Sequence, residues 1–172
     1  DVSGFCTVCT EPWIALRRTP QLPRPRRWQA GASAAVPLPM VEAIQADWVE
    51  LECADAGVMP AWWARPSSPR AAVLVLPEVF GVNGWVRSVA ERLAQQGYAA
   101  LAISTFWRTA PRLEAAYDEA GLALGRQHRD QVRADQLRAD VAVAAAWMQQ
   151  AHAAAGLAEK PLGCVGFCFG GH

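Results

Sequence analysis

The sequence predicts an α/β fold, in which helices flank a parallel sheet. Three short and mostly apolar runs, at residues 71–77, 98–104 and 161–167, have the length of strands. Segments with helical spacing of apolar residues separate them, and this alternation of strand and helix favours a parallel sheet. A chain of 172 residues with 52% hydrophobic residues can bury the core of one domain.

The N-terminal part of the chain divides at about Met40. Residues 1–39 are rich in Pro and Arg and show no apolar period, so we expect a disordered or linker-like extension that limited proteolysis removes. The Cys6-Thr7-Val8-Cys9 motif lacks a second pair of ligands nearby, which argues against zinc. Structured sequence is expected over 40–172. It starts with a β-hairpin formed by "DWVELEC" and "GVMPAWWA" around the turn sequence "ADAG".

The remaining elements follow in order. The run 71–77 ends at Pro77 and is typical of a strand buried on both faces of a parallel sheet. Residues 84–98 have helical spacing, with Gly97 as a C-terminal stop. Helical patterns are also present over 112–128 and 130–153. The runs 98–104 and 161–167 are expected to be the second and third buried strands.

Charge and cysteine content limit the class of protein. The chain has 16 basic and 16 acidic residues, and this balance argues against nucleic acid or an anionic membrane as the main partner. Its apolar runs are shorter than the ~20 residues that span a bilayer, and its start does not resemble a secretory signal. Five unevenly spaced cysteines do not suggest a disulfide framework, so a reducing cytoplasm is expected.

The sequence Gly166-Phe167-Cys168-Phe169-Gly170 follows a predicted strand and would open a helix. This is the context of a nucleophile elbow, a sharp strand-to-helix turn that exposes a nucleophile. Side chains two positions before and after Cys168 would collide in such a turn, so glycine is required there. The N–H groups of the following helix would lower the pKa of a thiol and stabilise an oxyanion. The alternative is a glycine-rich turn with a buried cysteine.

Three other residues have competing interpretations. Cys164 lies inside the third strand and is expected to be a core thiol, and Cys53 in the hairpin is also expected to be buried in packing. Glu78 sits at the C-terminal end of the first buried strand, where α/β folds place ligands. By itself Glu78 is better explained as a helix-capping or loop carboxylate.

Taken together, the stretches "VLVLPEVFGVNGWVRSVAERLAQQGYAAL" and "GCVGFCFGGH" resemble the dienelactone hydrolase family of the α/β-hydrolase fold. The resemblance covers roughly residues 45–172 and is weaker between 104 and 160. It implies an incomplete α/β-hydrolase domain, with a parallel sheet, flanking helices and an N-terminal β-hairpin, that stops at the nucleophile elbow.

The resemblance also implies roles for individual residues. Cys168 matches the family nucleophile, and Glu78 matches the glutamate that interacts with its thiol in the resting site. The backbone N–H groups of Phe169 and Val79 match the oxyanion-hole donors, and Arg126 is a candidate for binding a substrate carboxylate. The implied reaction is attack of the thiolate on the carbonyl of a small ester or lactone, giving an acyl-enzyme, with no metal and no organic cofactor.

The sequence also departs from the family pattern. Ile103-Ser104 stands where the family commonly has Pro-Asp, which bears on the shape of the pocket and on the substrate. Arg129 competes with Arg126 for the substrate-binding role, and both also fit surface positions. Neither the substrate nor the oligomeric state follows from the sequence.

The family triad continues with an Asp and a His on loops after later strands. His172 follows Cys168 too closely in sequence to be the base, and His128 and His152 are expected on helices along the sheet flanks, away from the strand ends. We therefore expect a truncated and inactive piece of a longer hydrolase. Two alternatives remain: a glutamine amidotransferase-like or related thiol enzyme, and a non-catalytic fragment that binds partners.

Overall fold

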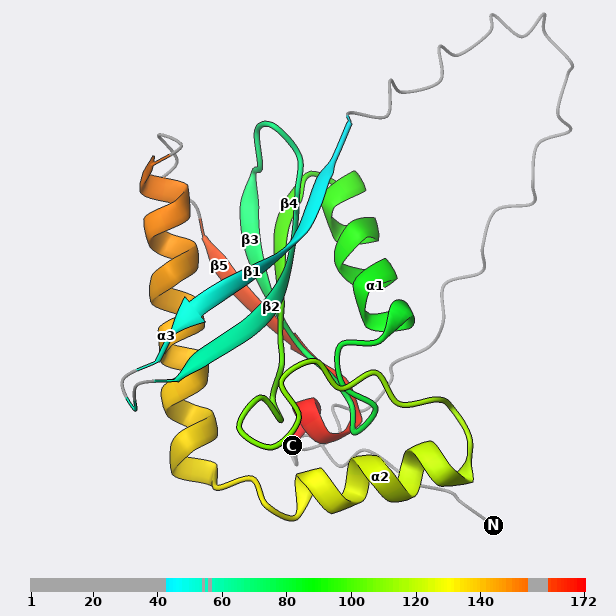
Figure 1. Cartoon of the computed structure of the whole chain (residues 1–172). Coiled ribbons are helices and arrows are strands. Elements are labelled where there is room, and N and C mark those ends of the chain that lie inside the picture. The colour runs from blue at the N-terminus through cyan, green and yellow to red at the C-terminus, as the bar shows by residue number, and fades with distance from the viewer. Residues whose placement is uncertain (1–42, 54, 56, 155–160) are drawn as a thin grey trace, which may run out of the picture. The chain divides into compact units, whose positions relative to one another are not determined.

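The computed structural model describes residues 43–172 except 54, 56 and 155–160 (Figure 1). The predicted extension over 1–39, with Cys6 and Cys9, therefore lies outside the described residues. The elements are β1 (Gln45–Glu52), β2 (Val58–Arg65), β3 (Ala71–Leu76), α1 (Gly84–Gln95), β4 (Tyr98–Ile103), α2 (Glu119–Arg129), α3 (Ala134–Ala154), β5 (Leu162–Gly166) and the short 3-10 helix η1 (Cys168–Gly171).

The strands form one mixed sheet in the order β1-β2-β4-β3-β5. Strands β3, β4 and β5 are mutually parallel, as predicted, and the expected hairpin β1-β2 joins them because β2 pairs antiparallel with β4. From β3 the chain moves to β4 on one side and then crosses to β5 on the other side. In open α/β sheets such a reversal opens a crevice at the carboxyl ends of the strands, and ligands bind there.

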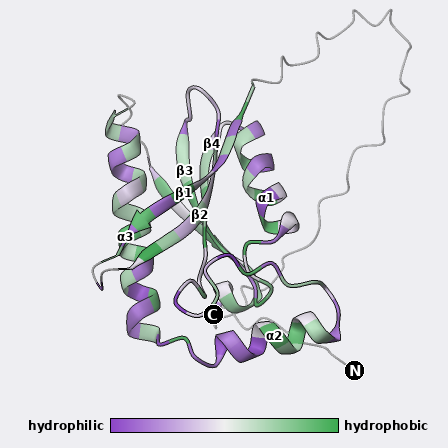
Figure 2. Ribbon diagram, viewed as in Figure 1, coloured by the Kyte–Doolittle hydropathy of each residue, from purple (hydrophilic) through white to green (hydrophobic). Residues whose placement is uncertain are grey.

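Helices cover both faces of the sheet. On one face α3 packs over a core that includes Leu74, Leu101 and its own Met148, and on the other α1 packs Val86 against Val75 and Ala100. The two cores use alternate residues of each strand because successive side chains point to opposite faces. Hydrophobic and hydrophilic residues alternate along α3 in Figure 2, as expected of a helix that covers a sheet on one side only.

The helix predicted over 112–128 begins later than expected. Helix α2 starts at Glu119, after its N-cap Asp118, whose side chain accepts a hydrogen bond from the Gly121 N–H (2.7 Å). The preceding segment instead pairs with the loop after β3, since Gly81 and Glu114 form a β-bridge. A tertiary contact thus overrides the local helical pattern.

The expectation that 161–167 is a buried strand is wrong in one respect. Strand β5 forms in the predicted place, but it lies at the edge of the described sheet, and Gly163 and Cys164 are exposed. A strand with one neighbour has less cover than the central strand β4, where five of the six residues are buried. Cys164 is therefore not the core thiol that its strand position suggested.

Within the described residues, no helix combines the length and apolar character needed to cross a bilayer. The same residues contain no group of three or more His, Cys, Asp or Glu side chains arranged to hold a metal ion.

Candidate active site

Cys168 occupies a sharp turn directly after β5. Its φ is 49°, the only positive φ of a described residue other than glycine, and its thiol is exposed. L-residues rarely adopt this left-handed region, and strained residues of this kind cluster at active sites. The strand is followed by the short 3-10 helix η1, four residues long, from Cys168 to Gly171. The backbone therefore has the strand-to-helix turn of a nucleophile elbow.

The glycines on either side of Cys168 are required by close backbone contact, as predicted. A Cβ on Gly166 would lie 2.0 Å from the carbonyl oxygen of Gly170, and a Cβ on Gly170 would lie 2.4 Å from that of Leu76. Both separations are far below van der Waals contact. Only glycine at these two positions lets the turn fold back on itself and on β3.

Glu78 and Cys168 lie just beyond the carboxyl ends of two neighbouring strands, β3 and β5. Leu76 of β3 pairs with Gly166 of β5, and each of the two residues follows its strand partner by two positions. The Phe167 N–H also donates to the Leu76 carbonyl (3.1 Å), which continues the pairing up to the residue before Cys168. Because β3 and β5 are parallel neighbours, Glu78 and Cys168 follow neighbouring carboxyl strand ends, where the strand order predicts a ligand site.

The Glu78 carboxylate has a partner that the sequence did not predict. The Tyr117 hydroxyl donates a hydrogen bond to Glu78 Oε1, and the Tyr117 ring packs against Phe80 with a centroid separation of 4.6 Å. Tyr117 comes from the loop between β4 and α2, in the segment where the family resemblance is weak. No spacing in the sequence marks it.

The two backbone amides proposed as oxyanion donors lie on the two loops at this edge. Val79 follows Glu78 and is buried, and Phe169 follows Cys168. Helix α2 supports the first loop closely, since a Cβ on Gly125 would lie 2.2 Å from the Val79 carbonyl oxygen.

Aromatic side chains surround the turn. Trp85 packs edge-to-face on Phe167 with a centroid separation of 5.0 Å, and Phe106 lies 5.5 Å from Phe169. Phe106 also stacks on the His128 ring at 6.4 Å. The expectation that His128 lies on a sheet flank is therefore wrong, because α2 runs across the carboxyl edge of the sheet, at the same end as η1 (Figure 1).

The other histidines and the arginines are placed as follows. His128 Nδ1 shares a hydrogen bond with Thr109 Oγ1 (3.0 Å), and His152 is buried in α3, where it lines a cleft beside Trp63 and Trp147. His172 is exposed just after η1. Arg126 is exposed on α2, and Arg129 pairs with Asp130 (2.7 Å).

The described thiols differ in environment. Cys53 is buried, as predicted, and its pKa is raised by burial and then by the carboxylates of Asp140 and Asp55. Partial burial likewise raises the pKa of the Cys164 thiol. Both effects disfavour the thiolate, which is the reactive form.

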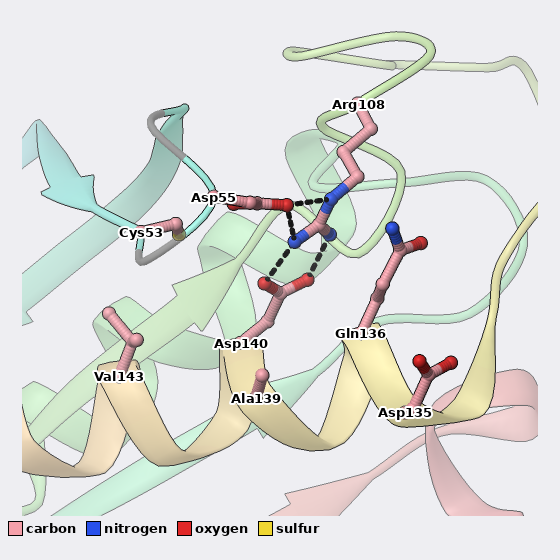
Figure 3. A pocket seen from close by; sticks show the side chains of 8 residues that line it. All are labelled: Cys53, Asp55, Arg108, Asp135, Gln136, Ala139, Asp140 and Val143. Atoms are coloured by element: carbon pink, nitrogen blue, oxygen red, sulfur yellow. Dashed lines mark hydrogen bonds and ion pairs between the residues drawn. The ribbon is translucent and has the colours of Figure 1, made fainter.

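A second polar cluster, also missed by the sequence reading, lies beside a cavity of about 230 Å³ (Figure 3). The Arg108 guanidinium donates two hydrogen bonds to the buried Asp140 (2.7 and 2.9 Å) and one to Asp55 (2.8 Å). The Trp107 indole N–H also donates to Asp140 (3.0 Å). The cluster joins the hairpin tip, the loop after β4 and α3, and its charges are satisfied within the fold.

A mixed sheet covered by helices on both faces, with a strained cysteine turn at a strand end, defines the class of α/β hydrolases. The model of the dienelactone hydrolase family matches residues 59–172, and the chain belongs to this family. The assignment agrees with the resemblance seen in the sequence and separates the chain from the glutamine amidotransferase-like alternative.

Similar proteins support this assignment. The chain is 36% identical over 99 residues to a "Putative carboxymethylenebutenolidase" of Synechocystis, covering 58% of the chain and 39% of that protein. A Salmonella typhi protein with the same description is 35% identical, with 66% and 40% covered. A crystal structure of a dienelactone hydrolase from Klebsiella pneumoniae, itself described as putative, matches with a TM-score of 0.61 and 32% identity, covering 75% of the chain and 52% of that protein. The chain thus spans about two fifths to one half of the length of these relatives.

Proposed function

We propose that this protein is a hydrolase of small esters or lactones that uses Cys168 as its nucleophile. The observation that supports this most directly is the φ of 49° at Cys168, held between two glycines that tolerate no Cβ. A buried structural cysteine has no need of such a conformation. The exposed thiol at the carboxyl edge of the sheet is what a nucleophile requires.

In the proposed reaction the Cys168 thiolate attacks the carbonyl carbon of the ester. A C–S bond forms, and the N–H groups of Val79 and Phe169 stabilise the negative charge on the carbonyl oxygen. The ester C–O bond then breaks, and the departing alkoxide takes up a proton. Water hydrolyses the thioester, which releases the acid and restores the thiol.

We assign Glu78 a role in the active site before substrate binds. In this proposal its carboxylate faces the Cys168 thiol across the paired ends of β3 and β5 and opposes loss of the thiol proton until substrate binds, because a nearby negative charge disfavours the thiolate. Arg126, exposed on α2 at the same edge of the sheet, is the proposed contact for a substrate carboxylate. The proposal needs neither a metal nor an organic cofactor, and the reducing cytoplasm suits a free thiol nucleophile.

We propose further that the 172 residues by themselves form the acyl-enzyme but do not turn over. Deacylation needs a base within ~3 Å of the attacking water. Of the described histidines, His128 is engaged with Thr109 and His152 lies in a different cleft on α3. His172 follows the nucleophile on the same short turn, which is a poor position for reaching across to the thiol.

The test is mass spectrometry of the chain after incubation with 4-nitrophenyl acetate. We expect one acetyl group on Cys168, release of about one equivalent of 4-nitrophenol, and no further turnover. Cys164→Ala should behave like the wild type, since Cys164 is the other exposed thiol of the described region. Cys168→Ala should abolish the adduct within residues 43–172.

Two results would contradict this proposal. Acetylation of Cys164 in preference to Cys168 would remove the assigned nucleophile. Sustained turnover that depends on Cys168 would show that a histidine of this chain serves as the base, and substitution of His128 and His172 in turn would then identify it.

A further inference from the structure

We propose that Tyr117 is a positioning residue that holds the Glu78 carboxylate in the resting site and so sets the reactivity of Cys168. This inference rests on the proposed function, in which Glu78 faces the Cys168 thiol. It adds a residue that lies outside the motifs of the elbow and of the loop after β3.

The direct contact is the hydrogen bond from the Tyr117 hydroxyl to Glu78 Oε1. It engages one of the two carboxylate oxygens and leaves Oε2 for the contact with the thiol that the proposed function assigns to Glu78. Glu78 is half-buried at the strand end, whereas Tyr117 is 57% exposed, so the tyrosine approaches the carboxylate from the solvent side. An exposed tyrosine contributes little to a core, which makes a purely structural role a poor explanation for its position.

The segment that presents Tyr117 is fixed to the loop it contacts. Gly81 and Glu114 form a β-bridge, the Ala115 N–H donates to the Phe80 carbonyl (3.0 Å), and the Tyr117 ring packs on Phe80. These contacts join the loop after β4 to the loop after β3 at consecutive points. The hydroxyl is therefore held at a defined distance from Glu78, as positioning requires.

The neighbouring ionisable groups have partners of their own. On the elements packed around this loop, Arg87 and Glu114 form an ion pair (2.5 Å), Asp118 caps α2, and His128 is hydrogen-bonded to Thr109. His172 lies on the turn of Cys168. Among the described residues, Tyr117 is the side chain that makes a hydrogen bond to the Glu78 carboxylate.

The environment of the phenol agrees with this geometry. The pKa of Tyr117 is raised, first by burial of the hydroxyl and next by its hydrogen bond to Glu78, while Asn83 acts in the opposite direction. The protonated phenol, which is the form that donates to Glu78, is thus the stable form over the whole physiological range.

The chemical consequence concerns the thiol. A hydrogen bond from Tyr117 withdraws charge from the Glu78 carboxylate and limits its motion. Without it, a freer and more negative carboxylate beside Cys168 opposes formation of the thiolate more strongly. The Tyr117–Glu78 hydrogen bond is present with both forms of the thiol, so only the difference in its strength between them changes the thiolate population. A net hydrogen bond of about 0.5–1.5 kcal/mol therefore sets an upper limit of roughly tenfold on that change.

The experiment measures the rate of iodoacetamide labelling of Cys168 against pH in the 172-residue chain, resolved by peptide mass spectrometry. The variants are Tyr117→Phe, Glu78→Gln and the double variant, with Tyr98→Phe as the matched control because the chain has two tyrosines. Tyr117→Phe should slow labelling at neutral pH by a factor of up to about ten and move the profile to higher pH. Glu78→Gln should accelerate labelling, and the double variant should match Glu78→Gln.

The outcomes separate the two proposals. If Glu78→Gln changes the profile and Tyr117→Phe does not, the role of Tyr117 is wrong and the proposed function stands. An equal effect of Tyr117→Phe with and without Glu78 also overturns the inference, because the tyrosine then acts by another route. If Glu78→Gln leaves the profile unchanged, Glu78 does not face the thiol. This inference then fails together with the resting-site role of Glu78, while acetylation of Cys168 still decides the proposed nucleophile.

A second measurement leaves residue 117 in place, in case Tyr117→Phe disturbs the loop. In Tyr98→Phe, Tyr117 is the remaining tyrosine, and its ionisation is followed by ultraviolet absorbance. Adding Glu78→Gln should move this titration to lower pH, because a carboxylate that accepts from the phenol favours its protonated form. An unchanged titration would show that the Tyr117–Glu78 hydrogen bond is not formed in solution.

Discussion

At Cys168 the backbone adopts a conformation that an isolated cysteine would avoid. A φ in the left-handed region costs a non-glycine residue about 1–3 kcal/mol, so the surrounding contacts must compensate for it. Here the compensation comes from the pairing of β5 with β3, which continues through the Phe167 N–H. The pairing of the two parallel strands thus stabilises the strained conformation of the turn.

The glycine at position 170 gives the first prediction. In Gly170→Ala the new Cβ would lie 2.4 Å from the Leu76 carbonyl oxygen, so either the turn or β3 must move. We expect the free energy of unfolding to fall by about 1–3 kcal/mol, as for other overpacked sites, and labelling of Cys168 to change with it. Urea denaturation followed by circular dichroism measures the loss.

The matched control for that change is Gly163→Ala in the preceding strand β5. Its Cβ would have the Ala72 carbonyl oxygen as nearest neighbour at 3.9 Å, an ordinary contact. Stability should therefore be retained or slightly increased, since alanine is less flexible than glycine when unfolded. Equal losses in the two variants would mean that the close contact at Gly170 is not what requires glycine.

Tyr117 gives a prediction for the dependence of stability on pH. Its pKa is raised above the ordinary value of 10.0, so the folded chain holds the phenol proton where the unfolded chain releases it. The stability from this group is present below pH 10.0 and is lost as pH rises through the raised value. Denaturant unfolding above this pH should show a smaller decline in Tyr117→Phe than in the wild type.

Single residues differ in how well the sequence predicts them. The spacing of Gly166, Cys168 and Gly170 identifies the turn because the steric requirement is local. Tyr117 meets Glu78 across 39 residues of chain, and such a contact depends on the path of a loop that follows no pattern. Cys164 is exposed because its strand has one neighbour in the described sheet. The sequence of the strand alone does not indicate how many neighbours it has.

Among the elements, the loop after β4 is fixed by the ion pairs of Arg108. Its guanidinium contacts Asp140 on α3 and Asp55 at the hairpin tip, and the Asp140 side chain is 2% exposed. In Arg108→Met this buried carboxylate would lose its cation. We expect the free energy of unfolding to fall by about 3 kcal/mol, near the lower end of the range for buried pairs because Arg108 itself is partly exposed.

Arg133→Met is the control, because Arg133 pairs with Asp135 at the start of the same helix but on the surface. Water solvates that pair, so its loss should change stability little. Both variants are compared by thermal and urea unfolding. A small effect of Arg108→Met would show that water or another cation reaches Asp140 when the guanidinium is removed.

Helices and strands are predicted correctly where their sequence pattern is long or strongly apolar. Strands β3 and β4 and helices α1 and α3 follow from apolar runs and helical periodicity. Helix α2 begins later than its pattern because residues 113–117 contact the loop after β3 instead. The antiparallel pairing of β2 with β4 could not be predicted, since it depends on which edge of the sheet the hairpin meets.

At the scale of the whole molecule, we expect the edge strand β5 to govern whether the chain self-associates. Within the described residues β5 pairs with β3 alone, and its other side offers backbone N–H and C=O groups. Exposed strand edges of this kind pair with other chains. We therefore expect the 172-residue chain to self-associate as its concentration rises, which light scattering and size-exclusion chromatography detect.

Cys164→Lys tests whether β5 is the edge involved. The side chain is exposed, so the substitution should not disturb the core, and a charge on an edge strand opposes pairing. Association should weaken in this variant and persist in Cys164→Ser, which removes the thiol without adding charge. A chain that stays monomeric at all concentrations, or equal association in both variants, would contradict the prediction.

The reversal of strand order at β3 has an evolutionary consequence. The loops that leave β3, β4 and β5 at this edge supply Glu78, Tyr117 and Cys168, yet none of the three residues belongs to a strand. Insertions and deletions in such loops alter the surroundings of these three residues without shifting the register of any strand pair. Descendants of this fold can therefore acquire new substrates by changing loop length while inheriting the same sheet and the same cysteine turn.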